Sequence, residues 1–130
     1  MKIFVTVCLF LFAFSYGVYA QHGSIEDINW EFDTQKQMIK KHSYGYLYVE
    51  SEFFSTEEEA SANAKQLLCT KIEAWVKSQG FQPKAYMSKL KKRISLKEYV
   101  EFNPNMKFRY KYLAYILKSD ITSLLYEDEE

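Results

Sequence analysis

Cysteine and histidine are scarce in this chain, with two of each among 130 residues. Cys8 lies in the apolar leader described below, so Cys69 is the single cysteine of the remaining chain. A lone cysteine excludes an intramolecular disulfide, and one Cys with two His falls short of the four ligands of a closed zinc site. The sequence therefore predicts no bound metal and no cofactor, and a fold that depends on its hydrophobic core.

The chain also lacks an excess of positive charge, since 17 Lys and Arg residues are balanced by 17 Asp and Glu residues. Domains that bind nucleic acid are usually strongly basic. The stretch RYKY could imitate a base-stacking surface, but strand alternation places Arg109 and Lys111 on one face and Tyr110 and Tyr112 on the other. Stacking on a sheet needs rings and cations on a shared platform. We therefore predict no nucleic-acid binding.

Motifs of enzyme chemistry are missing as well: the chain shows no paired carboxylates, nucleophile motif, metal set or glycine-rich phosphate loop. His22 lies near the expected mature N-terminus, and His42 stands at the entry of a predicted strand with no nucleophile motif beside it. The acidic runs 57–59 and 127–130 lack the alternating ligands and turn glycine of a calcium loop. The sequence predicts a protein that is not an enzyme, with no catalytic residues.

Cys69 flanks the apolar stripe of a predicted helix. A reactive thiol needs an electropositive, exposed setting, so we interpret Cys69 as a half-buried small hydrophobe. A disulfide between two chains is the main alternative, because an unpaired cysteine in a secreted protein leaves that option open.

The first twenty residues have the form of a secretory signal peptide. Lys2 precedes a mainly apolar run from Ile3 to Phe14, and Val18-Tyr19-Ala20 places small residues before a cleavage site. The run is too short to span a bilayer of about 30 Å. We predict cleavage near Ala20, a secreted or periplasmic protein without a stable membrane anchor, and one α+β domain over residues 21–130 with an acidic, frayed tail from about residue 126.

The clearest predicted element is a long amphipathic helix over about residues 56–79. Ser55 with Glu58, or Thr56 with Glu59, matches a capping box, and Gly80 is a natural stop. One face carries apolar residues at helical spacing: Ala60, Ala64, Leu67, Leu68, Ile72, Trp75 and Val76. This face predicts packing against a sheet.

The remaining pattern predicts the strands of that sheet. Residues 42–51 are rich in tyrosine and bulky apolar residues, which is typical of a strand. Residues 93–102 and 107–117 flank Asn103-Pro104-Asn105, a turn sequence, and predict an antiparallel hairpin. We expect a β-α-β-β layer with a small, mainly antiparallel sheet, short N-terminal helical turns over about 24–41, a connector over 81–90, and a last helical turn capped by Ser119 or Asp120.

The segments YLYVESEFFSTEEEASANAKQLLCTKI and YILKSDI resemble the LPP20-like secreted and lipoprotein family of Bacteroides-type bacteria, itself similar to the N-terminal domain of a flagellar assembly protein. Val49 and Ser51 stand where that family has glycines. The resemblance implies a β-α-β-β layer and a role in envelope or extracellular assembly or interaction, and it supplies no catalytic residues.

Two surfaces are candidates for interaction. The sheet face opposite the long helix is expected to be covered either by the N-terminal turns or by a second chain, and we predict association through it. Its candidate residues are Tyr44, Tyr46, Tyr48, Tyr110 and Tyr112. The second surface is the basic segment 84–97, with Lys89, Lys91, Lys92 and Arg93 at its centre, which suits an anionic glycan, lipid or protein.

The favoured function is a secreted, non-enzymatic interaction or assembly module with a protein partner or self-association. The alternative is a small binding protein or inhibitor that docks an anionic ligand or protein through the basic segment.

Overall fold

We describe a computed structural model of the chain, which covers residues 24–105 and 107–127. The predicted signal peptide, His22 and the last three residues of the acidic tail lie outside these described residues.

The sheet has three antiparallel strands in the order β1-β3-β2, with β1 over Tyr46–Glu50, β2 over Ser95–Phe102 and β3 over Phe108–Leu117. β3 is the centre because its residues 108–115 pair with β2 along one edge and its residues 113–117 pair with β1 along the other. The α+β class, the hairpin and the long helix after the first strand are all confirmed. Before β1, residues Ser43–Gly45 form a 3-10 turn instead of extending the strand.

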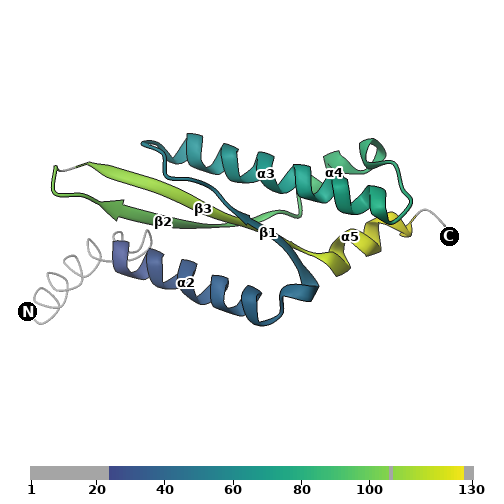
Figure 1. Cartoon of the computed structure of the whole chain (residues 1–130), viewed down its shortest axis with the longest axis horizontal. Coiled ribbons are helices and arrows are strands. Elements are labelled where there is room, and N and C mark those ends of the chain that lie inside the picture. Colours follow the sequence, from purple (N-terminus) through teal and green to yellow (C-terminus); the bar gives the residue numbers. More distant parts are fainter. Residues whose placement is uncertain (1–23, 106, 128–130) are drawn as a thin grey trace, which may run out of the picture.

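The long helix, α3, spans Glu57–Ser78 and covers one face of the sheet (Figure 1). Thr56 is its N-cap: the Thr56 hydroxyl accepts from the Glu59 N–H at 3.2 Å and donates to the Glu59 carboxylate at 3.0 Å. Gly80 ends the helix with φ +91°, a left-handed conformation that glycine adopts without strain. The predicted apolar face is confirmed except at Leu67, which is 41% exposed.

The N-terminal segment is one continuous helix, α2, over Ile25–Lys41, and not the short helical turns that we predicted. Ser24 caps it by accepting from the Asp27 N–H at 3.1 Å. Only two residues of α2 are fully buried, Phe32 and Ile39, and they lie two turns apart on one face of the helix.

The connector also contains more structure than its sequence suggested. Pro83–Ala85 forms a 3-10 turn and Met87–Lys91 forms a short helix, α4, with Met87 and Leu90 buried. The last helix, α5, spans Lys118–Leu125 and is longer than one turn. Neither Ser119 nor Asp120 caps it, since Leu117 occupies the N-cap position. Burial of Ile121, Leu124 and Leu125 stabilises α5 instead.

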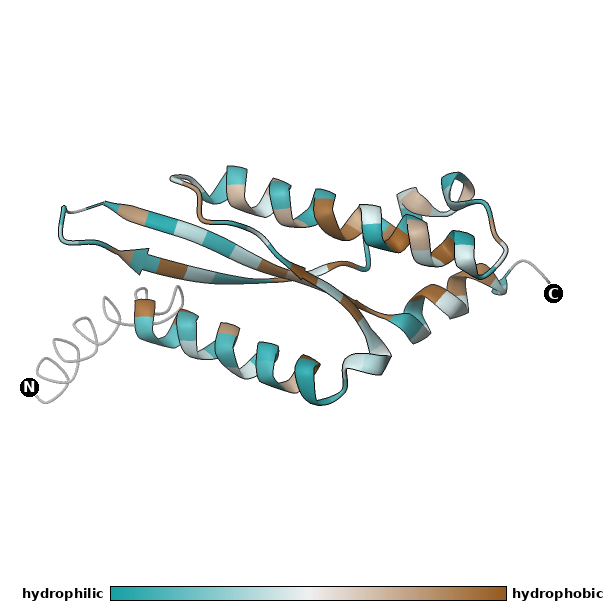
Figure 2. Cartoon of the chain, viewed as in Figure 1, coloured by the Kyte–Doolittle hydropathy of each residue, from teal (hydrophilic) through white to brown (hydrophobic). Residues whose placement is uncertain are grey.

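Helices cover both faces of the sheet. α2 lies on one face, whereas α3 lies on the other together with the buried residues of α4 and α5 (Figure 1). The two covers differ in character, because hydrophobic residues recur along α3 and α5 while α2 is mostly hydrophilic (Figure 2). Each face therefore has its own core.

Candidate functional site

The structure does not bring the five candidate tyrosines onto one surface. Tyr46 and Tyr48 are half-buried under α2, where they pack against the cluster of Phe32, Ile39 and Leu113. Tyr112 packs on the α3 side of the sheet, and Tyr110 lies near acidic residues of that same side. Tyr44, in the turn before β1, is 80% exposed.

This arrangement corrects the predicted interface on the sheet face opposite α3. Of the two covers that we considered, the N-terminal segment occupies that face, because α2 buries Phe32 and Ile39 against it. Sequence reasoning left both covers open and favoured association, having divided residues 24–41 into separate turns. A pair of turns would leave most of the face open, whereas a continuous 17-residue helix covers it.

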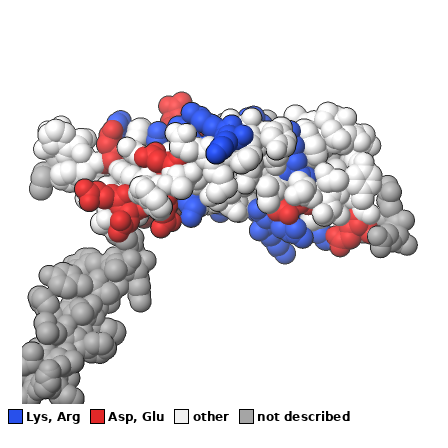
Figure 3. Space-filling view, turned by 90° about the horizontal axis from the view of Figure 1, so that it is seen from below, with Lys and Arg blue, Asp and Glu red and all other residues white. Residues whose placement is uncertain are grey.

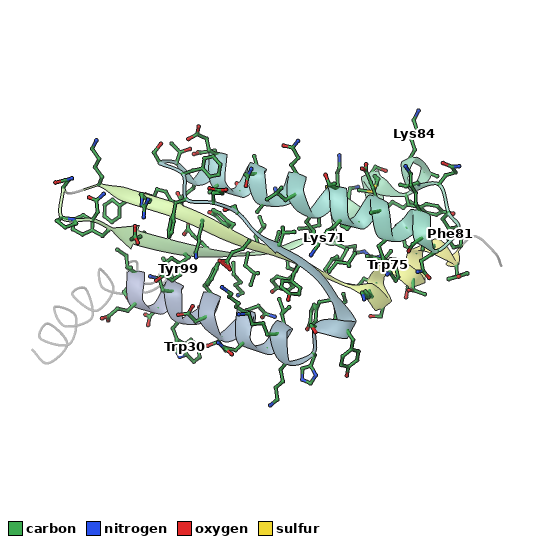
Figure 4. All side chains as sticks on the ribbon, in the orientation of Figure 1. Trp30, Lys71, Trp75, Phe81, Lys84 and Tyr99 are labelled. Atoms are coloured by element: carbon green, nitrogen blue, oxygen red, sulfur yellow. The ribbon has the colours of Figure 1, made fainter. Side chains whose placement is uncertain are left out.

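The two cations of the RYKY stretch, Arg109 and Lys111, lie on the α2 face. Lys111 lies among three aromatic rings, with Nζ at 5.5 Å from the centroid of Phe32, 5.0 Å from Phe53 and 5.1 Å from Tyr99. Figure 4 shows Tyr99 between the sheet and α2. Arg109 stacks over the Phe53 ring at 4.4 Å. Both cations therefore take part in intramolecular packing, as cation–π partners.

Lys111 also belongs to a charged cluster that ties α2 to the sheet. Its Nζ donates to Glu50 Oε1 at 3.0 Å, and Lys36 of α2 lies 2.6 Å from Glu50 Oε2. Burial opposes the charged carboxylate, but the hydrogen bonds and charges of the two lysines lower the pKa of Glu50 below its usual value. One carboxylate thus bridges α2, β1 and β3.

A second polar contact holds α2 to the edge strand. The Asn29 side-chain amide donates to the Val100 carbonyl at 2.8 Å, and its oxygen accepts from the Val100 N–H at 2.8 Å. These two backbone groups point away from β3 and would otherwise lie unpaired at the sheet edge. Asn29 therefore places the start of α2 beside the last residues of β2.

The basic segment is exposed as predicted. Lys84, Lys89, Lys91, Lys92 and Arg93 are all exposed, because α4 turns Met87 and Leu90 inward. In Figure 4, Lys84 points away from the body of the molecule. Lys97, at the end of the segment, instead turns toward α2, with its Nζ 3.3 Å from the Glu31 carboxylate. The four central cations thus lie on one accessible segment.

Cys69 is half-buried and packs against the core, which agrees with its interpretation as a small hydrophobe. Burial is the main cause that raises the pKa of its thiol. It lines a groove of about 480 Å³ together with Lys65, Lys91 and Ile94. The disulfide between chains stays a prediction. His42 is exposed at the C-terminus of α2, with the Tyr44 ring 6.4 Å away.

The tip of the β2–β3 hairpin carries an aromatic surface that the sequence did not reveal. Phe102 and Phe108 are directly opposite each other, with ring centroids 4.8 Å apart, and remain 46% and 43% exposed. Tyr110 continues the row, 6.5 Å from Phe108. The Asn103 side chain organises the turn by accepting from the N–H groups of Asn105 and Lys107. We call Phe102, Phe108 and Tyr110 the hairpin surface.

Acidic residues adjoin the hairpin surface on its α3 side. The Tyr112 hydroxyl donates to Glu98 at 2.8 Å, and Glu57 of the first α3 turn lies beside Glu98. Burial and the Glu57 carboxylate raise the pKa of Glu98 to about 7, which outweighs the opposite effect of the Tyr112 hydrogen bond. Desolvation and the same carboxylates raise the pKa of Tyr112. In the pairing of β2 with β3, Glu98 lies directly opposite Tyr112. The alternation of residues within each strand does not give this register.

Comparison of the chain with family models, curated proteins and solved structures finds no match. Among residues 24–105 and 107–127, no three His, Cys, Asp or Glu side chains are grouped as metal ligands. Within the same residues, none of the helices has the length and hydropathy needed to cross a membrane.

Proposed function

We propose that this chain is a secreted, non-enzymatic interaction module of the cell envelope or extracellular space, and that it binds its partner through the hairpin surface. Secretion rests on the form of the first twenty residues, and the envelope role on the resemblance to the LPP20-like family. The module role rests on the placement of exposed aromatic residues.

The observation that carries the proposal is the exposure of Phe102 and Phe108, which face each other near the end of the β2–β3 hairpin. α3 begins at Glu57, and the tip extends past its first turn at one end of the molecule (Figure 1). Contiguous exposed aromatic rings are unusual on monomer surfaces and are enriched at protein interfaces. Because the rings lie on a hairpin, a partner meets them without any rearrangement of the sheet.

The proposal is tested by cross-linking residues 21–130 to the envelope fraction of the secreting cell. We expect Phe102→Ser/Phe108→Ser to lose the cross-linked partner that the unchanged protein captures. Tyr44→Ser, which removes an even more exposed ring elsewhere, should retain it. Equal capture by both variants would contradict the role of the hairpin surface.

The alternative function is docking of an anionic ligand or protein through Lys89, Lys91, Lys92 and Arg93. The outward orientation of these cations on α4 and the residues after it supports this alternative. Charge reversal at Lys91, Lys92 and Arg93 should abolish capture under this alternative and leave it intact when the hairpin surface binds the partner. Such binding should also weaken as salt increases.

A further inference from the structure

The first turns of the two long helices bring acidic residues together at one end of the molecule. α2 and α3 run in the same direction, and both begin near the hairpin end (Figure 1). Two contacts fix this: Asn29 of α2 binds Val100, and Phe54, just before α3, pairs with Tyr110. Each helix has acidic residues in its first turn and basic residues in its last turn.

This pattern favours each helix individually, because acids stabilise the positive end of the helix dipole and bases the negative end. Since the helices are parallel, the same preference gathers acidic residues at the hairpin end. Glu26 and Asp27 come from α2, and Glu57, Glu58 and Glu59 come from α3. In Figure 3 a cluster of acidic groups lies toward the hairpin end, and other acidic and basic groups lie toward the opposite end.

The opposite end carries a groove with two lysines at its rim. The groove has a volume of about 410 Å³ and lies between the end of α3 and α4. Buried Pro83 and Met87 form its floor, and Lys77 and Lys84 are exposed at its rim beside one acid, Glu73. Figure 1 places α4 toward the end of the long axis away from the hairpin tip.

We propose that the hairpin surface of one copy of this chain docks into the Lys77–Lys84 groove of a second copy, so that molecules associate head to tail. Apolar Pro83 and Met87 suit the rings of Phe102 and Phe108, and the rim lysines suit both aromatic faces and the Glu57–Glu59 carboxylates. This proposal rests on the proposed function of the hairpin surface and names a second copy as its partner.

The symmetry of such a contact has a testable consequence. The two surfaces differ and lie at opposite ends, so the contact is heterologous and a dimer still has one free hairpin surface and one free groove. Association should therefore continue beyond a dimer as concentration rises, as an open chain or a ring. Because unlike charges take part, it should weaken when salt is raised from about 50 mM to about 500 mM, where screening lengths become short.

The experiment is sedimentation velocity on residues 21–130, which contain every described element. We expect the unchanged chain at low salt to form species heavier than one chain, and high salt to remove them. Phe102→Ser/Phe108→Ser and Lys84→Glu should each remain monomeric, with unchanged far-UV circular dichroism. Tyr44→Ser and Lys40→Glu are matched controls, because each alters an exposed residue outside both surfaces and should associate normally.

Mixing the two interface variants provides the decisive result. Lys84→Glu retains an intact hairpin surface, and the double Phe variant retains an intact groove, so a mixture should form a dimer that grows no further. A single-chain mass for the unchanged protein at every concentration and salt, or a mixture that stays monomeric, would overturn head-to-tail association. If cross-linking to another protein still requires Phe102 and Phe108 in that case, the proposed function survives and only this inference fails. If the Phe variant changes neither result, both fail.

Discussion

The two faces of the sheet are built from different chemistry. On the α3 face, aliphatic side chains such as Ala64, Leu68 and Ile116 are fully or almost fully buried. On the α2 face, a small cluster around Phe32 is surrounded by half-buried tyrosines and by Lys111 among its aromatic rings. The stabilisation from hydrophobic burial does not depend on pH or on the orientation of the groups, whereas the strength of cation–π and ion-pair contacts depends on both charge and geometry. The α2 face should therefore be the weaker and more condition-dependent attachment.

The largest expected effect tests whether α2 and α3 can detach from the sheet independently. Phe32→Ala should cost about 3–5 kcal/mol and Leu68→Ala about 2–5 kcal/mol of unfolding free energy, since both side chains are fully buried. Phe32→Ala should increase amide hydrogen exchange in α2 before α3, because α2 depends on that ring. Leu68→Ala should increase exchange in both helices together. Tyr44→Ala, at an exposed site, should change neither. Parallel loss of both helices in Phe32→Ala would show that the faces are not separable.

The next effect tests the charged attachment of α2. Glu50→Gln should cost about 1 kcal/mol near pH 7, because it removes two ion pairs at a half-exposed site. The folded pKa of Glu50 is lowered, so its contribution is present above its usual value near 4.5 and is lost as pH falls below it. Urea unfolding at pH 7 and pH 3.5 should show a difference that shrinks in acid. Glu52→Gln, two residues along and exposed, is the control.

A third effect has the opposite pH dependence and comes from the α3 face. The folded pKa of Glu98 is raised to about 7, so the protein loses stability as pH rises from about 4.5 to about 7. Glu98→Gln should therefore be more stable than the unchanged protein at pH 8 and nearly equal to it at pH 4. Tyr112→Phe removes the hydroxyl that stabilises the Glu98 carboxylate and should steepen the loss. A Glu98→Gln profile parallel to that of the unchanged protein in urea unfolding would contradict the assignment.

The predictable parts of the fold are those governed by local pattern. The capping residue Thr56, the stop at Gly80 and the hairpin turn at Asn103 follow from side-chain and backbone rules that act over a few residues, and the structure confirms each. The α2 helix was not predicted as one element because its two buried anchors are seven residues apart. Its stability depends on Asn29, Lys36 and Phe32 meeting the sheet, which local pattern does not contain.

The candidate surfaces divide in the same way. The basic segment was identified from its dense run of cations, but the short helix α4 that buries Met87 and Leu90 beneath them was not predicted. The tyrosines were grouped incorrectly because alternation gives the two faces of each strand but does not say which face of β1 matches which face of β3. That match depends on register: Tyr48 pairs with Tyr115, so Tyr46 and Tyr48 share a face with Leu113 and not with Tyr112.

The sequence by itself determined the α+β class, the span of the long helix and the hairpin, because each depends on contacts within one element or between neighbours in the chain. Only the tertiary structure decided which helix covers which face, where Lys111 finds its three rings, and that the first turns of α2 and α3 meet at one end. Those outcomes depend on contacts between residues far apart in sequence. Strand order and register select these contacts, and local propensity does not.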